Sequence, residues 1–179
     1  MSEHSVENIA IVQKRWEEVD VAHDLEAPYD VVIASFSLGM FDIRDAVEKM
    51  IQASSRYIYP YHFAGETSWS RQWKELWPRL HGRDYISGPM SDVLDNVLYQ
   101  MGIYPNVLME NTGAWGAWSN ETMEDAFAEI KGKLGLKEST EHDDFLRGLL
   151  KERLTYRDGR WVWPPSMRSA LVYWDVERR

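Results

Sequence analysis

The alternation of apolar and polar positions along the chain predicts strands that alternate with helices. Residues 29–38 contain a continuous apolar run, which favours a strand covered on both faces, as in a parallel sheet. Behind a helix N-cap candidate, Asp42, apolar residues recur at helical spacing. These are Ile43, Ala46, Val47, Met50 and Ile51. Residues 56–63 predict the next strand, and Pro60 places a strand end or a sheet edge there. Strand, helix and strand in this order build parallel sheets.

The rest of the chain predicts further elements of both kinds. Strands are expected over residues 8–15, 106–110 and 169–176, with a hairpin turn at Asp158-Gly159. Helices are expected over residues 69–77, 91–101, 121–134 and 143–154. Pro78 should stop the first of these helices, while Ser91 should cap the second and Gly102 should end it.

Length and charge narrow the class of protein. The 179 residues are the size of one domain, so we expect a single domain over residues 1–179. No apolar run approaches the roughly 20 residues of a membrane span, and a net charge of −9 disfavours a nucleic-acid binder. The chain has no cysteine and no secretory signal at its start, which favours a soluble protein in the reducing cytoplasm.

The order of a strand, a charged loop, the 29–38 strand, a helix, a strand and a β-rich tail resembles class I S-adenosylmethionine-dependent methyltransferases from their third strand onward. Residues 29–38 followed by Phe41-Asp42 are similar to the fourth-strand motif of that family, whose carboxyl end faces cofactor and substrate. The resemblance implies an α/β fold with a partial Rossmann-like methyltransferase sheet. That sheet would be mostly parallel with an antiparallel C-terminal strand, and would carry helices on both faces.

The chain departs from the family in two places. The family's first strand, its glycine-rich cofactor turn and its second strand with an acidic end are absent. Residues 9–13 would therefore lack the first strand as their usual neighbour. The chain is therefore expected to be a truncated methyltransferase-like fold: a fragment, a product of an internal start, or a chain completed by a partner polypeptide. In the second departure, Arg15 stands where the family has an Asp for the adenine amino group, and Trp16 can stack on the base instead.

The resemblance implies a cofactor site for S-adenosylmethionine at the loop of Arg15 and Trp16 and at the strand end of Ser35, Phe36 and Ser37. Ligands in open α/β sheets bind outside the carboxyl ends of the strands, which points to the same edge. For Ser35 to Ser37 the alternative is an ordinary strand end with hydroxyl caps.

Four further residues are candidates for the chemistry. His62 is the candidate general base, because its ordinary pKa suits proton transfer, although a histidine among aromatic residues is often structural. Asp42, Tyr61 and Trp69 are candidate substrate contacts. For Asp42 the alternative is the helix cap, and for Trp69, which shares a helical stripe with Trp73 and Trp77, it is a face packed on the core.

The carboxylates at residues 141–144 suit the start of a helix, and no metal site is expected there. The leading hypothesis for function is a methyltransferase that acts on a small molecule and binds its cofactor once the absent N-terminal half is supplied. The alternative is a non-catalytic methyltransferase-like subunit or scaffold that has lost cofactor binding.

Overall fold

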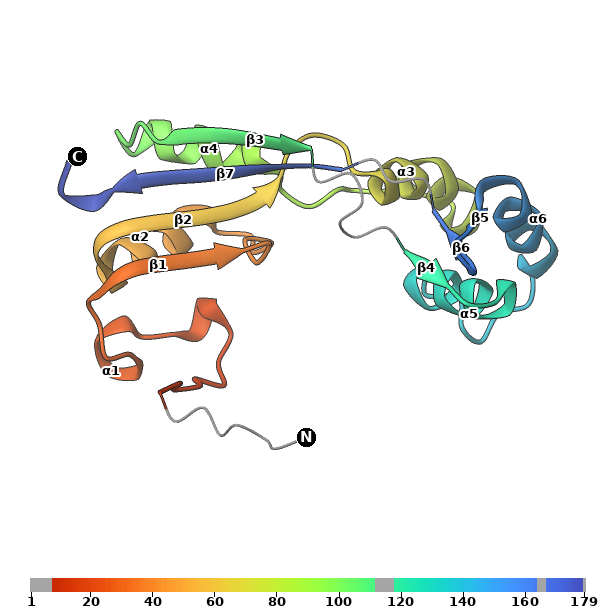
Figure 1. Ribbon diagram of the computed structural model, residues 1–179, viewed down its shortest axis with the longest axis horizontal. Coiled ribbons are helices and arrows are strands. Elements are labelled where there is room, and N and C mark those ends of the chain that lie inside the picture. The colour runs from red at the N-terminus through yellow and green to blue at the C-terminus, as the bar shows by residue number, and fades with distance from the viewer. Residues whose placement is uncertain (1–7, 112–117, 164–166, 179) are drawn as a thin grey trace. The chain divides into compact units, whose positions relative to one another are not determined.

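The computed structural model describes residues 8–111, 118–163 and 167–178 (Figure 1). The chain divides into two compact units. Unit 1 takes the described residues of 1–62, 89–108 and 171–179, and unit 2 takes those of 63–88 and 109–170. The single domain expected from the length of the chain stays a prediction. None of the described helices is both long enough and apolar enough to cross a membrane.

Unit 1 is built on the predicted strand, helix and strand. Strand β1 (Tyr29–Ser35) leads through helix α2 (Ile43–Ala53) into strand β2 (Ser54–Phe63), and the two strands pair in parallel with Val31 opposite Tyr57. Helix α2 begins as expected, because the Asp42 carboxylate accepts a hydrogen bond from the backbone N–H of Asp45 at 2.9 Å.

The sheet of unit 1 has the strand order β1-β2-β7-β3, where β3 is Asn106–Asn111 and β7 is Arg168–Asp175. The arrow of β7 runs opposite to those of β1, β2 and β3, so the C-terminal strand is antiparallel in an otherwise parallel sheet (Figure 1). This confirms a mixed α/β fold. The edge position expected for Pro60 is wrong, since this residue lies in the interior strand β2, opposite Ala34.

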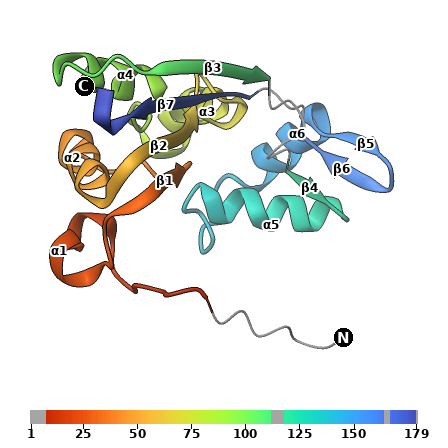
Figure 2. The same cartoon turned by 60° about the vertical axis from the view of Figure 1, so that its left-hand side comes forward.

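The helices of unit 1 gather on one face of the sheet. Helices α2 and α4 (Ser91–Gln100) contact each other and lie on the same side of it (Figure 1, Figure 2). Helix α4 ends at Gln100, and Gly102 just beyond it has a positive φ of 75°, as suits the predicted stop. Its N-cap residue is Met90 and not Ser91. The short helices η1 (Trp16–Glu18) and α1 (Val21–Asp24) pack on α2, and the chain ends in η2 (Val176–Arg178).

Burial along the strands shows which face the helices cover. In β2, Ile58 and His62 are buried, whereas Tyr57 and Tyr59 on the alternate positions are only half-buried. On β1, Val31 is 43% exposed and Ile33 is 69% exposed. In the described part of unit 1, the helices thus cover one face only, which differs from the expectation of helices on both. An apolar run shows that both faces of a strand could be buried. Whether they are buried depends on covering elements from elsewhere in the chain, which the run itself does not specify.

Residues 9–13 do not form the predicted strand. They run without regular structure and leave Ile9 66% and Ile11 80% exposed. A strand needs a neighbour to pair its backbone N–H and C=O groups. Among the described residues this segment has no such neighbour, so β-branched composition alone does not make it a strand.

The described part of unit 2 holds three helices and a small antiparallel sheet. The helices are α3 (Ser68–His81), α5 (Met123–Lys133) and α6 (Asp143–Arg153), and the sheet has the order β4-β6-β5. Its strands are β4 (Ser119–Asn120), β5 (Thr155–Arg157) and β6 (Arg160–Val162). The core between these elements includes Trp73, Leu76, Phe127, Ile130, Leu146, Leu150 and Trp163.

Two turns of unit 2 test the sequence signals directly. The Asp158-Gly159 hairpin is confirmed, with positive φ angles of 51° and 79° that suit a type I′ turn between β5 and β6. The stop expected at Pro78 is wrong, because α3 continues through it and ends at Gly82, which adopts the left-handed conformation with φ 65°. A helix can pass a proline when packing offsets the lost hydrogen bond, and Leu76 and Leu80 on either side are buried.

Candidate functional site

The carboxyl ends of β1 and β2 lie side by side and bring three of the predicted residues together. Ser35 is paired with Tyr61 in the parallel ladder. The backbone N–H of Phe36 donates to the carbonyl of Tyr61 at 2.8 Å, and the two rings lie 5.8 Å apart. This is the edge at which open α/β sheets bind ligands.

Phe36 has a φ of 50°, in the left-handed region that residues with a Cβ rarely adopt. Such a conformation costs about 1–2 kcal/mol and persists where the surroundings demand it. Here it ends β1 abruptly and turns the chain back toward the helix side of the sheet. Strain of this kind is concentrated at ligand sites, which makes the strand end a candidate site in its own right.

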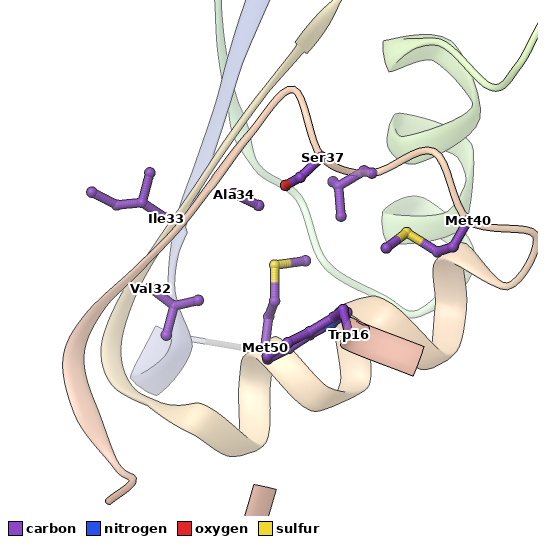
Figure 3. A pocket seen from close by; sticks show the side chains of 8 residues that line it. Trp16, Val32, Ile33, Ala34, Ser37, Met40 and Met50 are labelled. Carbon is purple, nitrogen blue, oxygen red and sulfur yellow. The ribbon is translucent and has the colours of Figure 1, made fainter. Parts of the chain in front are cut away.

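A small apolar pocket lies beside this turn, between β1 and α2 (Figure 3). It has a volume of about 150 Å³ and is lined by Trp16, Val32, Ile33, Ala34, Ser37, Leu38, Met40 and Met50. The side chains of Trp16, Met50, Met40 and Ser37 converge on it, whereas that of Ile33 points to the other side of the strand (Figure 3).

Trp16 is held at the pocket by the helix that follows β1. Its indole Nε1 donates to the carbonyl of Ala46 at 3.2 Å, a contact between residues 30 positions apart. The ring therefore has a fixed edge on α2 and offers its remaining surface to the pocket. Lys49 reinforces the loop by donating to the carbonyl of Glu17 at 2.7 Å.

The lining residues define what the pocket can hold. A cavity of about 150 Å³ accommodates one benzene-sized ring, and whole-ligand sites usually measure about 300–1,000 Å³. None of the eight described lining residues carries a charge. The pocket therefore fits part of a flat ring system such as adenine, with the Ser37 hydroxyl as a polar contact. It offers no carboxylate for a ribose and no cation for an amino-acid carboxylate.

Besides Ser35, Phe36 and Tyr61, two further predicted residues lie near this site without lining the pocket. Arg15 is exposed and precedes η1 as its N-cap residue. The Asp42 carboxylate caps α2, which supports the structural alternative for this residue. A substrate contact by Asp42 stays a prediction.

His62 lies on the opposite face of β2 from Tyr61, with an exposed fraction of 4%. Burial lowers its pKa below the usual value, while hydrogen bonding to the Pro89 backbone and the nearby Asp92 carboxylate oppose this shift. The imidazole is therefore neutral at physiological pH and faces the helices. A catalytic role for His62 stays a prediction.

Trp69 belongs to unit 2, where its ring meets that of Phe63 edge to face at 5.0 Å. It also packs against the core, as does Trp77, and Trp73 is buried within it. The tryptophan stripe thus takes the core position that was its alternative. In the described residues, no group of His, Asp or Glu side chains is placed to hold a metal ion.

Sequence reasoning missed most of the pocket wall. Leu38, Met40 and Met50 line it, although Met50 was identified only as part of the apolar stripe of a helix. That stripe was the available signal. Met50 faces the pocket only because α2 crosses beneath β1.

Comparison with known proteins leaves the family open. No family model matches the chain, and no curated protein matches it. A solved structure from Bacillus halodurans C-125, described as a "putative methyltransferase", aligns with a TM-score of 0.42 and 11% sequence identity. The alignment covers 83% of this chain, and the chain spans 64% of the length of that structure. A likeness of this size assigns no activity.

Proposed function

We propose that this chain is a methyltransferase-like protein that acts on a small molecule and receives part of the adenine ring of S-adenosylmethionine in the pocket of Trp16 and Ser37. The observation that carries the proposal is the convergence of Trp16 with the strand end of β1 on one ring-sized apolar pocket. Both elements were expected to face the cofactor because of the resemblance of the sequence to class I methyltransferases.

The fold is compatible with this role. A parallel β1-α2-β2 unit supports the pocket, and the C-terminal strand runs antiparallel, as the resemblance implies. The strained turn at Phe36 carries Ser37 from the strand end to the pocket wall. We include in this proposal that the sheet is Rossmann-like, as the resemblance to class I methyltransferases implies.

Each residue at this edge has a distinct role in the proposed binding of cofactor and substrate. Trp16 stacks on the ring, because an indole face supplies dispersion and quadrupole attraction, and the Ser37 hydroxyl contacts its polar edge. S-adenosylmethionine, when bound, supplies an activated methyl group. Tyr61 presents its ring beside Phe36 at the edge where a small acceptor would approach. Methyl transfer depends mainly on alignment, so this edge needs no strong acid or base.

One observation favours the second candidate, a non-catalytic methyltransferase-like subunit. The described pocket is uncharged and small, so groups for the ribose and the amino-acid end must come from other residues. Binding of the whole cofactor to this chain should therefore be weak, and a subunit that has lost it altogether would look similar.

Isothermal titration calorimetry separates the two candidates. The full chain is titrated with S-adenosylmethionine and, in parallel, with adenosine. We expect both to bind. We expect Trp16→Ala to weaken binding about 5- to 150-fold, through loss of base stacking worth about 1–3 kcal/mol. Trp161→Ala, at a half-buried tryptophan of unit 2, is the matched control and should leave affinity unchanged.

Two results would contradict the proposal. If neither ligand binds at millimolar concentration, the non-catalytic subunit is the better account. If both bind but Trp16→Ala binds as tightly as the original chain, the pocket is not the adenine site.

A further inference from the structure

Strand β1 is an open edge of the sheet. It pairs with β2 on one side, and no described strand pairs with its other side. Natural edge strands are protected by lysines, prolines, bulges or short length. In β1 the register is irregular only between Tyr29 and Val31, and the one charged residue, Asp30, stands near the start. The rest of the strand, residues 31–35, has none of these protections.

The exposed side chains of this edge are apolar. Ile33 is 69% exposed and points to the face that the helices leave uncovered (Figure 3). Val31, two positions earlier on the same strand and therefore on the same face, is 43% exposed. Across the same face, Tyr59 stacks on Tyr173 with ring centroids 5.5 Å apart. The outward N–H and C=O groups of β1 can pair with a further strand, and the exposed Val31 and Ile33 would pack against the side chains of that strand.

We propose that this further strand is β1 of a second copy of this chain, which pairs antiparallel with β1 of the first copy across a two-fold axis at Val32. In this register Val32 stands opposite its own copy, and Val31 stands opposite Ile33 of the second copy. Asp30 stands opposite Ala34, so no like charges meet. The strand is thereby complementary to itself, which a two-fold interface requires.

The apolar pairs also fall on one face. Directly opposite residues of antiparallel strands point to the same side, so Val31 of one copy and Ile33 of the other bury each other twice per dimer. The other edge strand, β3, is less suited to such pairing, because its exposed apolar residues Val107, Leu108 and Met109 are followed directly by the charged Glu110.

The proposed interface is small, so the dimer should be weak. Seven residues at about 3.4 Å each give a strand about 24 Å long, so the contact is at the low end of specific interfaces. We therefore expect a dimer that dissociates on dilution. This inference does not depend on the proposed function, since it concerns the open edge of β1 and not ligand binding.

Sedimentation-velocity ultracentrifugation of the full chain over a wide range of concentrations tests the proposal. We expect a monomer-dimer equilibrium. Val31→Asp and Ile33→Lys should each weaken it about 5- to 30-fold, because each places a charge against an apolar side chain. The double variant should recover much of the loss, since the new carboxylate of each copy then stands opposite the new ammonium of the other.

Val107→Asp is the matched control, because this valine has the same kind of exposure, 44%, on the opposite edge strand. It should leave the equilibrium unchanged. Val31 and Ile33 are both exposed, so circular dichroism should show that the variants remain folded.

The chain has no cysteine, which allows a second measurement of the register. Under mild oxidation, Val31→Cys mixed with Ile33→Cys should form a disulfide-linked dimer, whereas neither variant alone should do so efficiently. Directly opposite residues lie within disulfide reach, while diagonal ones are about 7–8 Å apart.

Three results would overturn the proposal. They are a monomer at every concentration, an effect of Val107→Asp as large as that of Val31→Asp, and a double variant weaker than either single variant.

Discussion

Phe36 donates its backbone N–H to the carbonyl of Tyr61 at 2.8 Å while holding a φ of 50°. This bond ties the end of β1 to the end of β2 and maintains the left-handed turn that leads to the pocket. The relationship yields a test of the strained backbone that is separate from any test of activity.

Residue types differ in how well they tolerate the conformation of Phe36. Asparagine accepts left-handed φ angles and β-branched residues do not. We expect Phe36→Asn to be more stable than Phe36→Val by about 1 kcal/mol, although valine is the more apolar residue. Urea denaturation measures the difference. Equal stability of the two variants would show that the turn is not left-handed in solution.

His62 should make stability depend on pH. Burial lowers its pKa in the folded protein, so the unfolded chain takes up the proton first as pH falls through about 6.5. The free energy of unfolding should then decrease by up to about 1.4 kcal/mol per pH unit below that point. His62→Gln should flatten this slope, as measured by denaturation at several pH values. A slope that is unchanged in His62→Gln would contradict this explanation.

Asp95 should make stability depend on pH in the opposite direction to His62. Burial and the neighbouring Asp92 carboxylate raise its pKa, so ionisation of Asp95 opposes folding at neutral pH. Stability from this group is gained as pH falls, because the folded protein takes up the proton before the unfolded chain does. Asp95→Asn should therefore raise the melting temperature at pH 7, by an amount that shrinks toward pH 4. If the exposed Asp84→Asn gives the same gain, the effect is one of net charge.

The ion pair between Lys131 and Asp143 predicts an asymmetry between two variants. The Nζ of Lys131 lies 2.7 Å from the Asp143 carboxylate, and the lysine side chain is the more buried partner. Removal of the carboxylate leaves a buried charge unpaired, whereas Lys131→Met leaves a carboxylate that water can reach. We expect Asp143→Ala to cost about 3 kcal/mol and Lys131→Met to cost clearly less.

Urea denaturation checks this asymmetry. The exposed pair of Glu124 and Arg147 is the control, and Glu124→Ala should cost clearly less than Asp143→Ala, because water screens an exposed pair. A larger loss in Lys131→Met than in Asp143→Ala would contradict the explanation.

Local signals in the sequence predicted most of the elements. The apolar run of β1, the Asp42 cap of α2 and the Asp158-Gly159 turn are each specified by a few neighbouring residues, and the structure contains all three. Two local signals failed where packing outweighed them. Helix α3 continues past Pro78, and Pro60 lies in an interior strand.

The candidate site was predicted only in part. Trp16 and Ser37 do line one pocket, whereas Arg15 is exposed beside it and Asp42 serves as a cap. Met50 could not be identified as a wall residue, because its position in a helical stripe is equally typical of an ordinary core. Its place in the pocket depends on how α2 crosses β1.

By itself, the sequence determined the β-α-β order, the Asp42 cap of α2 and the hairpin, because periodicity, capping and turn conformation act within a few residues. Tertiary structure alone decided that residues 9–13 are not a strand, that the indole of Trp16 is tied to Ala46, and that Ile33 is exposed. Each of these depends on which distant segment lies alongside. A strand forms only when another strand accepts its backbone hydrogen bonds, and an apolar face is buried only when another element covers it.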